Sequence, residues 1–375
     1  MYNPTSIFHN TVPDDVINID DPKFRTDQYD PTYAQSIFKF KRRNENKYIL
    51  NEKQLLSAQG GGIQTEIKPS MRITLIDWLV RIADDYRLDS GTYSLAIHLL
   101  DQTLSLINVK RSHFQLLGCA CLWLAAKLEE LHPPPVESLA LIADYCFEVE
   151  QLVNYEKKLL RIFEYRPAMP TRHYFVMRFV RAGECSPREI SLAQYITELS
   201  FYDVTLLTYP MSAIAAASLH LTLQIMRPLN DLDNPDEPYM IWTPTLKYYT
   251  GYSEVDLVAI LLNLREKHFH VEHAEHKYIQ RKYEKPSFHR VTQIGPLRLE
   301  DVRFDSDIAS SVMNELLNPK SEINVFGDAY KLESMNTKST APNEESNNVN
   351  RDQDIKINPA NTSNNPTRNN KRRRK

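Results

Sequence analysis

Met71-Arg72-Ile73-Thr74-Leu75-Ile76-Asp77-Trp78-Leu79-Val80 is the stretch of sequence that decides the fold. At about 100° per residue, the apolar side chains of this helix-length segment fall on two stripes. One stripe comprises Met71, Leu75, Trp78 and Ile82, and the other comprises Ile76, Leu79, Val80 and Ala83. A surface helix needs only one apolar stripe. The segment is therefore either the centre of a helical bundle or a helix that also presents an apolar strip to a partner.

Composition sets the outer limits of the fold and function. The 375 residues, 42% of them hydrophobic, are enough for two domains with large cores plus tails. The net charge of −3 gives no general signature of nucleic-acid binding. The four cysteines have no CxxC spacing, so we expect reduced core thiols of a cytosolic or nuclear protein at Cys119, Cys121, Cys146 and Cys185. No signal-peptide pattern and no bilayer-length apolar run occurs, and we expect no membrane partner.

Helix start and stop signals predict an all-α fold. The expected helices lie at about 70–87, 90–106, 111–130, 135–145 and 148–165, and then at 171–183, 187–202, 209–226, 244–251 and 253–272, with a trailing helix near 273–283. Helix N-caps are expected at Asp89, Ser186, Thr243 and Ser253. A helix rich in small residues stands third in each half, and the two are about 95 residues apart. Because small residues allow close helix approach, we expect each to be the centre of a bundle.

The segments outside the two halves have different patterns. Residues 1–28 show no sustained period and are expected to be flexible. Residues 29–69 contain one helix, predicted from Tyr33, Ile37 and Phe40, and a linker with a flexible joint at Gly60-Gly61-Gly62. Residues 296–375 are expected to be a largely disordered tail, because its later part is polar and poor in hydrophobic residues.

The motifs of both halves resemble the cyclin family. Met71–Val80 is similar to the opening helix of the cyclin box, and later motifs follow in cyclin order. In the first half these are Leu100-Asp101, Leu116-Leu117-Gly118, Ala125–Glu130 with Pro133-Pro134, and Tyr155-Glu156; in the second half they are Pro210–Ala217, Trp242–Leu246, Tyr249–Ser253 and Lys282-Tyr283, as in A- and B-type cyclins. The resemblance implies an all-α fold of two tandem five-helix cyclin boxes (70–167 and 168–295) with an N-terminal helix and disordered tails.

The resemblance also implies a function: a non-catalytic subunit that binds and activates a cyclin-dependent Ser/Thr protein kinase in the mitotic or meiotic cell cycle. Lys127 and Glu156 would be its kinase-contacting pair, and Tyr165 would pack on the kinase's mobile helix. The implied kinase-binding residues are Lys127, Glu156, Tyr165, Leu128 and Glu129, and the implied internal ion pair is Arg72 with Asp101. Without the resemblance, Lys127 and Glu156 would be interpreted as two solvated surface charges.

A second implied site is a substrate-docking patch on the opening helix. Its residues are Met71, Leu75, Trp78, Arg81, Arg111 and Gln115, and it would bind Arg-x-Leu-like motifs of substrates or inhibitors. Two residues depart from the family pattern: Thr74 replaces the usual isoleucine and Arg81 the usual acidic residue. Because Arg81 would repel an arginine of the motif, we expect an altered motif preference. The alternative is that Met71 and Trp78 are bundle core.

The remaining motifs are weaker. His268, His270, His273 and His276 could bind a metal, but solvated histidines are commoner at a helix end, and we expect no metal and no cofactor. The basic run Lys371, Arg372, Arg373, Arg374 and Lys375 is either a nuclear import signal or a solvated tail. The import reading gives a nuclear and cytoplasmic location.

Two other classes of function, and the timing of use, complete the expectations. A transcription adaptor bound to nucleic acid would need a basic face on the boxes. The net acidic balance of the chain argues against such a face, so we expect no direct nucleic-acid contact. An enzyme would need a catalytic motif, and none is present. The only Arg-x-x-Leu sequence runs from Arg72 to Leu75, inside the opening helix, so another route of turnover or restricted use in meiosis would fit.

Overall fold

The computed structural model describes residues 12–24, 30–51, 54, 63–227, 240–271 and 277–317. These residues form helices and connecting segments, without a strand among them. Three expectations lie outside the described residues: the joint at 60–62, the histidines at 273 and 276, and everything from 318 onward, including the basic run 371–375.

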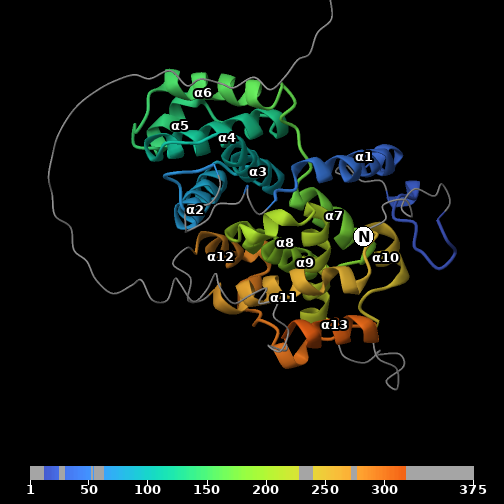
Figure 1. Ribbon diagram of the computed structural model, residues 1–375. Helices are drawn as coiled ribbons and strands as arrows, with labels where there is room; N and C mark the ends of the chain where they lie inside the picture. The colour runs from blue at the N-terminus through green and yellow to red at the C-terminus, as the bar shows by residue number, and fades with distance from the viewer. Residues whose placement is uncertain are drawn as a thin grey trace, which may run out of the picture. The chain divides into compact units, whose positions relative to one another are not determined.

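The first box consists of five consecutive α-helices in the described chain (Figure 1). They are α2 (Pro69–Asp85), α3 (Ser90–Leu106), α4 (Phe114–Glu129), α5 (Val136–Ile142) and α6 (Val149–Ile162). Helix α4 lies centrally and contacts α2, α3 and α6. Gly118 allows this packing, because a Cβ there would lie only 2.9 Å from Cδ1 of Leu75. The prediction that the small-residue helix is central is confirmed for this half.

The second box repeats the arrangement. Its helices are α7 (Arg172–Ala182), α8 (Pro187–Leu199), α9 (Met211–Met226), α10 (Pro244–Thr250) and α11 (Glu254–His270). Helix α9 is buried from Met211 to Gln224 and packs against α7, α8 and α11. The predicted caps are confirmed: Asp89, Ser186 and Thr243 accept backbone hydrogen bonds at their helix starts, and Ser253 forms a capping box with Asp256.

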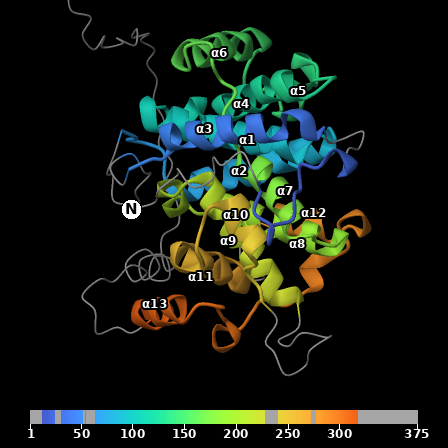
Figure 2. The ribbon, with the colours of Figure 1, turned by 90° about the vertical axis from the view of Figure 1, so that its right-hand side faces the viewer.

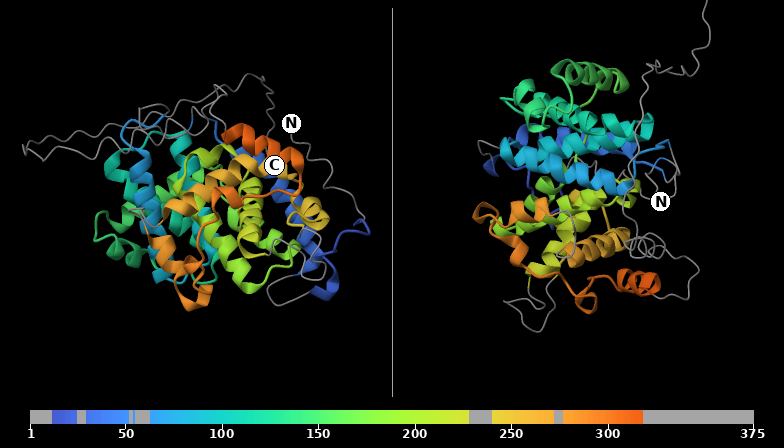
Figure 3. Two further views of the ribbon diagram at one scale, coloured as in Figure 1. Left: turned by 90° about the horizontal axis from the view of Figure 1, so that it is seen from below. Right: turned by 90° about the vertical axis from the view of Figure 1, so that its left-hand side faces the viewer.

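The fold continues past residue 295, where the sequence predicted a largely disordered tail. After the short helix α12 (Tyr278–Tyr283), residues 299–305 lead into α13 (Asp307–Leu317). Helix α13 lies along α11 (Figure 3), where Ala309 is fully buried against Val258 and Leu262. Residues 296–317 are therefore ordered, because α13 buries an apolar face on the second box.

The segment 12–24 also differs from expectation, because it packs on the second box instead of being free. Ile19 is only 2% exposed, and its backbone N–H donates to the Tyr249 hydroxyl over 3.2 Å. The backbone N–H of Ile17 donates to Oγ1 of Thr245. Both acceptors lie on α10, beside which the dark blue segment runs in Figure 1. These contacts join residues more than 200 positions apart, which no local pattern reveals.

Helix α1 (Pro31–Asn44) forms as predicted, with Asp30 as its cap (Figure 2). The residues that predicted it face outward, since Tyr33, Ile37 and Phe40 are 65%, 45% and 67% exposed. Its buried face instead carries Ala34, Phe38 and Arg42. The helix thus presents an apolar stripe that the described residues leave largely uncovered.

Candidate partner-binding site

Lys127 and Glu156 form an ion pair between the last turn of α4 and the middle of α6. The two side chains are unequally accessible: the Glu156 side chain is 8% exposed and the Lys127 side chain 35%. The Lys127 ammonium also lies 3.8 Å from the centre of the Trp123 ring, a distance at which cation and ring attract each other. The lysine is therefore fixed by two contacts while its charge stays partly open to solvent.

Exposed apolar side chains stand at the end of α4, close to Lys127 in the sequence. Leu128 is 43% exposed, and Leu131, in the connection after α4, is 87% exposed. The neighbouring Glu129 is exposed as well. Exposed apolar residues around a fixed charge are typical of a surface that a partner covers. Leu131 was not predicted as a site residue, although an isolated leucine just before the proline-rich loop was a signal for it.

Tyr165 stands at the end of α6 in an uncommon backbone conformation. Its φ is 58° and that of Glu164 is 49°, a region that non-glycine residues rarely adopt. The backbone N–H of Tyr165 donates to the carbonyl of Leu160 over 2.7 Å, which ends the helix. The Tyr165 side chain is 70% exposed. The strained turn therefore holds an aromatic ring outward.

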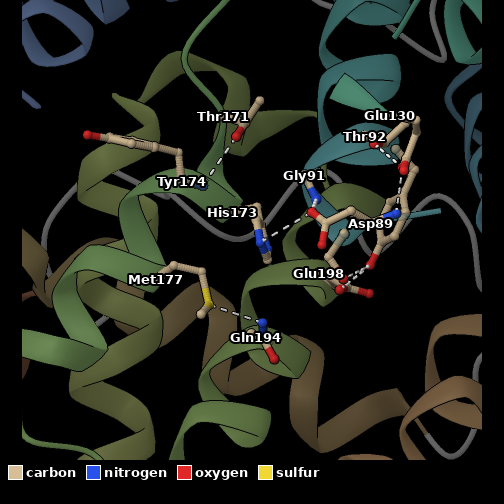
Figure 4. A network of polar contacts seen from close by, with 12 residues as sticks. Asp89, Gly91, Thr92, Glu130, Thr171, His173, Tyr174, Met177, Gln194 and Glu198 are labelled. Carbon is tan, nitrogen blue, oxygen red and sulfur yellow. Dashed lines mark hydrogen bonds and ion pairs between the residues drawn. The ribbon is translucent and has the colours of Figure 1, made fainter. Parts of the chain in front are cut away.

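The end of α4 is anchored to the start of α3 (Figure 4). Glu130, the C-cap residue of α4, accepts hydrogen bonds from the Asp89 backbone N–H (2.7 Å) and the Thr92 hydroxyl (2.5 Å). Asp89 in turn caps α3, and His173 of α7 lies 3.8 Å from its carboxylate. Burial lowers the pKa of His173, although the Asp89 charge acts in the opposite direction. These contacts fix the position of the neighbouring Lys127.

Arg72 and Asp101 form the internal pair that the resemblance implied. Nε and Nη2 of Arg72 lie 2.6 and 2.7 Å from the two carboxylate oxygens of Asp101, and the arginine is fully buried. Its Nη1 also donates to the carbonyl of Phe201, which follows α8. This third contact was not expected from the sequence, and it ties the opening helix to the second box.

A second tie between the boxes is centred on Glu198 of α8. Its carboxylate accepts hydrogen bonds from Lys282 (2.8 Å) and Tyr283 (2.6 Å) of α12 and from Tyr93 of α3. Asp77 of α2 accepts from the Tyr202 hydroxyl and the Tyr278 backbone N–H. The two boxes are thus joined by buried polar contacts. These contacts restrict movement of the first box, which carries the α4–α6 surface, relative to the second.

Helix α1 lies close to the same surface. Lys41, near its C-terminal end, has a pKa lowered by burial, and the charge of Glu129 acts on it in the opposite direction. Lys41 also lies over the Tyr174 ring at 4.8 Å. Because Glu129 ends α4, the C-terminal end of α1 lies within electrostatic reach of the end of α4.

The predicted docking strip is partly core and partly surface. Leu75 is buried at 6% exposure, whereas Met71 and Trp78 are half-buried and pack on the core from its edge. Gln115 is half-buried, and Thr74, Arg81 and Arg111 are exposed. Arg81 pairs loosely with Asp85 at 3.9 Å. The strip therefore combines accessible apolar edges with an exposed arginine near each end.

Comparison with known proteins decides the family. Residues 36–167 match the cyclin N-terminal domain and residues 170–297 the cyclin C-terminal domain. The chain belongs to the cyclin family. It is 32% identical over 272 residues to G2/mitotic-specific cyclin-A of Hydra viridissima, covering 72% of this chain and 61% of that protein. It is 32% identical over 268 residues to cyclin-A1 of Carassius auratus, covering 71% and 64%. The matched part of this cyclin therefore covers less than two thirds of the length of each of these relatives.

The fold of a solved viral cyclin agrees with this family. The herpesvirus saimiri cyclin superposes with a TM-score of 0.50 at 18% identity, over 62% of this chain and 96% of that structure. A likeness at this identity shows the fold alone. It agrees with the predicted architecture of two tandem cyclin boxes.

The other sequence candidates take ordinary places in this cyclin. His268 is buried edge-on against Tyr195, and burial lowers its pKa to about 4, while His270 contacts Glu266. No cluster of three potential metal ligands, and no helix suited to crossing a membrane, occurs in the part of the chain that the structure describes. Cys119 and Cys121 are buried as expected, Cys185 is half-buried, and Cys146 is exposed, so the expectation of a core thiol was wrong for Cys146.

Proposed function

We propose that this cyclin binds and activates a cyclin-dependent Ser/Thr protein kinase through the surface around Lys127 and Glu156. The observation that carries the proposal is a fixed, partly open ion pair between α4 and α6. Leu128 in the last turn of α4, Leu131 just after α4 and Tyr165 just after α6 are all exposed. The outward stripe of α1 extends this surface. The cyclin itself performs no chemistry in this proposal.

Activation would proceed by population shift. A protein kinase is active only when the Glu of its mobile helix pairs with the Lys that orients ATP. A rigid surface that binds this helix-in state favours it by the difference between its affinities for the two states. The anchoring of α4 through Glu130 and the ties between the boxes supply the rigidity that such selection requires.

The test is histone-type kinase activity after mixing this cyclin with a purified monomeric cyclin-dependent kinase. Wild type should stimulate the kinase by orders of magnitude, and Lys127→Ala with Glu156→Ala should abolish stimulation. The free energy of unfolding should stay within about 1–2 kcal/mol of wild type, because these are contact residues. A matched control removes the exposed pair Arg298 and Glu300. Activation retained in the first double variant would contradict the proposal.

We also propose that the strip around Met71 and Trp78 docks short substrate or inhibitor peptides. At a rise of about 1.5 Å per residue, the ten steps from Met71 to Arg81 span about 15 Å, enough for four or five extended peptide residues. Arg81 stands at one end of the strip, and Lys68 and Arg111 at the other, all of them exposed. Cations at both ends favour an apolar motif with acidic flanks over an Arg-x-Leu motif.

A charge reversal tests this preference. Arg81→Glu should strengthen binding of an Arg-x-Leu peptide about tenfold and weaken binding of an acid-flanked peptide, measured by fluorescence anisotropy. Arg188→Glu, at an exposed site on α8, is the matched control. Equal binding of both peptides to wild type and to Arg81→Glu would contradict a docking role for this rim.

Location and timing complete the proposed function. The basic residues Lys371–Lys375 would direct nuclear import, supported by their uniform charge. Deleting them from a fluorescent fusion should move the protein from nucleus to cytoplasm. Use in the mitotic or meiotic cycle is supported by similarity to proteins described as G2/mitotic-specific cyclins.

A further inference from the structure

The segment 12–24 makes a built contact with the second box. Ile19 is buried, and two backbone N–H groups of the segment donate to side chains of α10. Asp20 adds a bidentate ion pair: its two carboxylate oxygens accept from Nη1 and Nη2 of Arg178 over 3.0 and 2.7 Å. Apolar, backbone and ionic contacts thus act together, which distinguishes the segment from a chain end resting on a surface.

Arg178 connects this segment to helix α1. It projects from α7, and its guanidinium lies 4.7 Å from the Phe38 ring of α1 and 5.5 Å from the Tyr249 ring of α10. The Phe38 ring in turn packs edge-on against Phe175 and Phe179 of α7. Because a planar guanidinium can stack and bind a carboxylate at once, one arginine joins four elements of the chain.

The same segment touches α1 directly. Its short 3-10 helix η2 (Pro22–Phe24) contacts α1, so residues 12–24 contact both α1 and the second box. The far end of α1 has its own tie: Arg42 pairs with Glu45, whose carboxylate accepts from the backbone N–H and the hydroxyl of Ser212. The segment therefore adds a contact to α1 that is independent of this second tie.

We propose that residues 12–24 are a clamp that holds α1 on the second box, and that Asp20 and Arg178 thereby set the affinity for the kinase. The clamp orders the stripe of Tyr33, Ile37 and Phe40 before the partner arrives. The entropy lost on ordering this stripe therefore does not reduce the free energy of binding. Asp20 and Arg178 are positioning residues that touch no partner. The inference about affinity rests on the proposed function, whereas the clamp itself is a property of the free chain.

The test compares Asp20→Asn, which weakens the ionic contact, with Asp15→Asn, the same change at an exposed acid of the same segment. Ile19→Ala independently weakens the apolar contact. Hydrogen exchange of the full chain should show at least tenfold faster exchange of α1 amides in Asp20→Asn and Ile19→Ala, with α9 amides and Asp15→Asn unchanged. In the kinase assay, the half-maximal cyclin concentration should rise at least threefold while maximal activity stays constant.

The outcomes distinguish a failure of the clamp itself from a failure of its role in kinase affinity. Unchanged α1 exchange in both clamp variants would overturn the clamp, whatever the kinase does. Faster exchange with an unchanged half-maximal concentration would overturn its role in affinity. A wild-type chain that activates no kinase would overturn the proposed function, while the exchange data would still decide on the clamp.

Discussion

The two boxes place an acid–base pair between their third and fifth helices, and they treat that pair in opposite ways. In the first box, Lys127 of α4 pairs with Glu156 of α6, and the lysine remains partly open. In the second box, His220 of α9 pairs with Glu254 of α11 over 2.8 Å, and both side chains are buried. The same helical framework thus carries an open pair once and a closed pair once.

The closure of the second pair comes from residues 302–317. The Glu254 carboxylate also accepts the backbone N–H groups of Asp305 (3.1 Å) and Ser306 (2.8 Å), just before α13 begins. The His220 ring stacks against Trp242 and Phe304 at 5.0 and 5.6 Å. No such cover lies over Lys127 in the described chain. The chain itself therefore closes the pair of the second box, whereas the corresponding pair of the first box stays accessible.

The largest expected effect comes from truncating the acid of each pair. Glu254→Ala leaves the buried His220 and two partly buried N–H groups without their acceptor, so the free energy of unfolding should fall by about 3–5 kcal/mol. Glu156→Ala should cost only about 1 kcal/mol, because Lys127 can be solvated, but it should impair kinase activation. Urea unfolding together with the kinase assay measures both. Equal stability losses would erase the distinction between the boxes.

The next effect concerns pH. Burial lowers the pKa of His98 in the first box to about 3 and that of His268 in the second to about 4, from 6.5 when unfolded. The unfolded chain therefore binds more protons below pH 6.5, and stability is lost as the pH falls through that value. Each histidine should lower the free energy of unfolding by about 2 kcal/mol between pH 7 and pH 5, since one pKa unit corresponds to about 1.4 kcal/mol.

Urea unfolding at pH 7 and pH 5 measures this loss. His98→Gln and His268→Gln should each flatten the pH dependence, by similar amounts in this range. Below pH 4 the two should separate, because His98 alone stays neutral. A pH dependence identical to wild type in either variant would show that the histidine is not buried in its neutral form.

The smallest expected effect tests the open face. Tyr165 has a φ of 58°, so Tyr165→Gly should relieve strain and raise the free energy of unfolding by about 1 kcal/mol. Kinase activation should nevertheless weaken, because the exposed ring is lost. Tyr145→Gly is the matched control: Tyr145 is 67% exposed, has a φ of 53° and follows α5. It should show the same gain in stability with unchanged activation, and a loss of activation there would contradict a specific role of Tyr165.

Local signals in the sequence were sufficient for most of the fold. Caps such as Ser186 with Glu189, and the small residues of α4 and α9, act within a few positions of the chain, so their effect can be predicted directly. Helix α13 had a readable signal too, because Ala309, Val312, Met313 and Leu316 follow helical spacing. It was missed because the polar composition of the later tail was extended back to residue 296.

Long-range contacts set the limit of prediction. The outward face of α1 depends on Arg178 and Phe175, which are more than 130 positions away and select Phe38 as the buried ring. The pairing of Arg72 with Asp101 was predicted from the family resemblance. The contact of Arg72 with Phe201 was predicted neither from the resemblance nor from the sequence pattern. Exposure around Lys127 is likewise a property of what the rest of the chain leaves uncovered.

The three tryptophans of this chain provide intrinsic fluorescence probes. Trp78 lies at the edge of the docking strip, Trp123 lies under the Lys127 ammonium, and Trp242 is buried in the second box with its indole N–H bonded to Tyr252. Indole emission depends on nearby charge and water. Single-tryptophan versions can therefore follow peptide docking, kinase capture and unfolding of the second box by separate fluorescence signals, without an added dye.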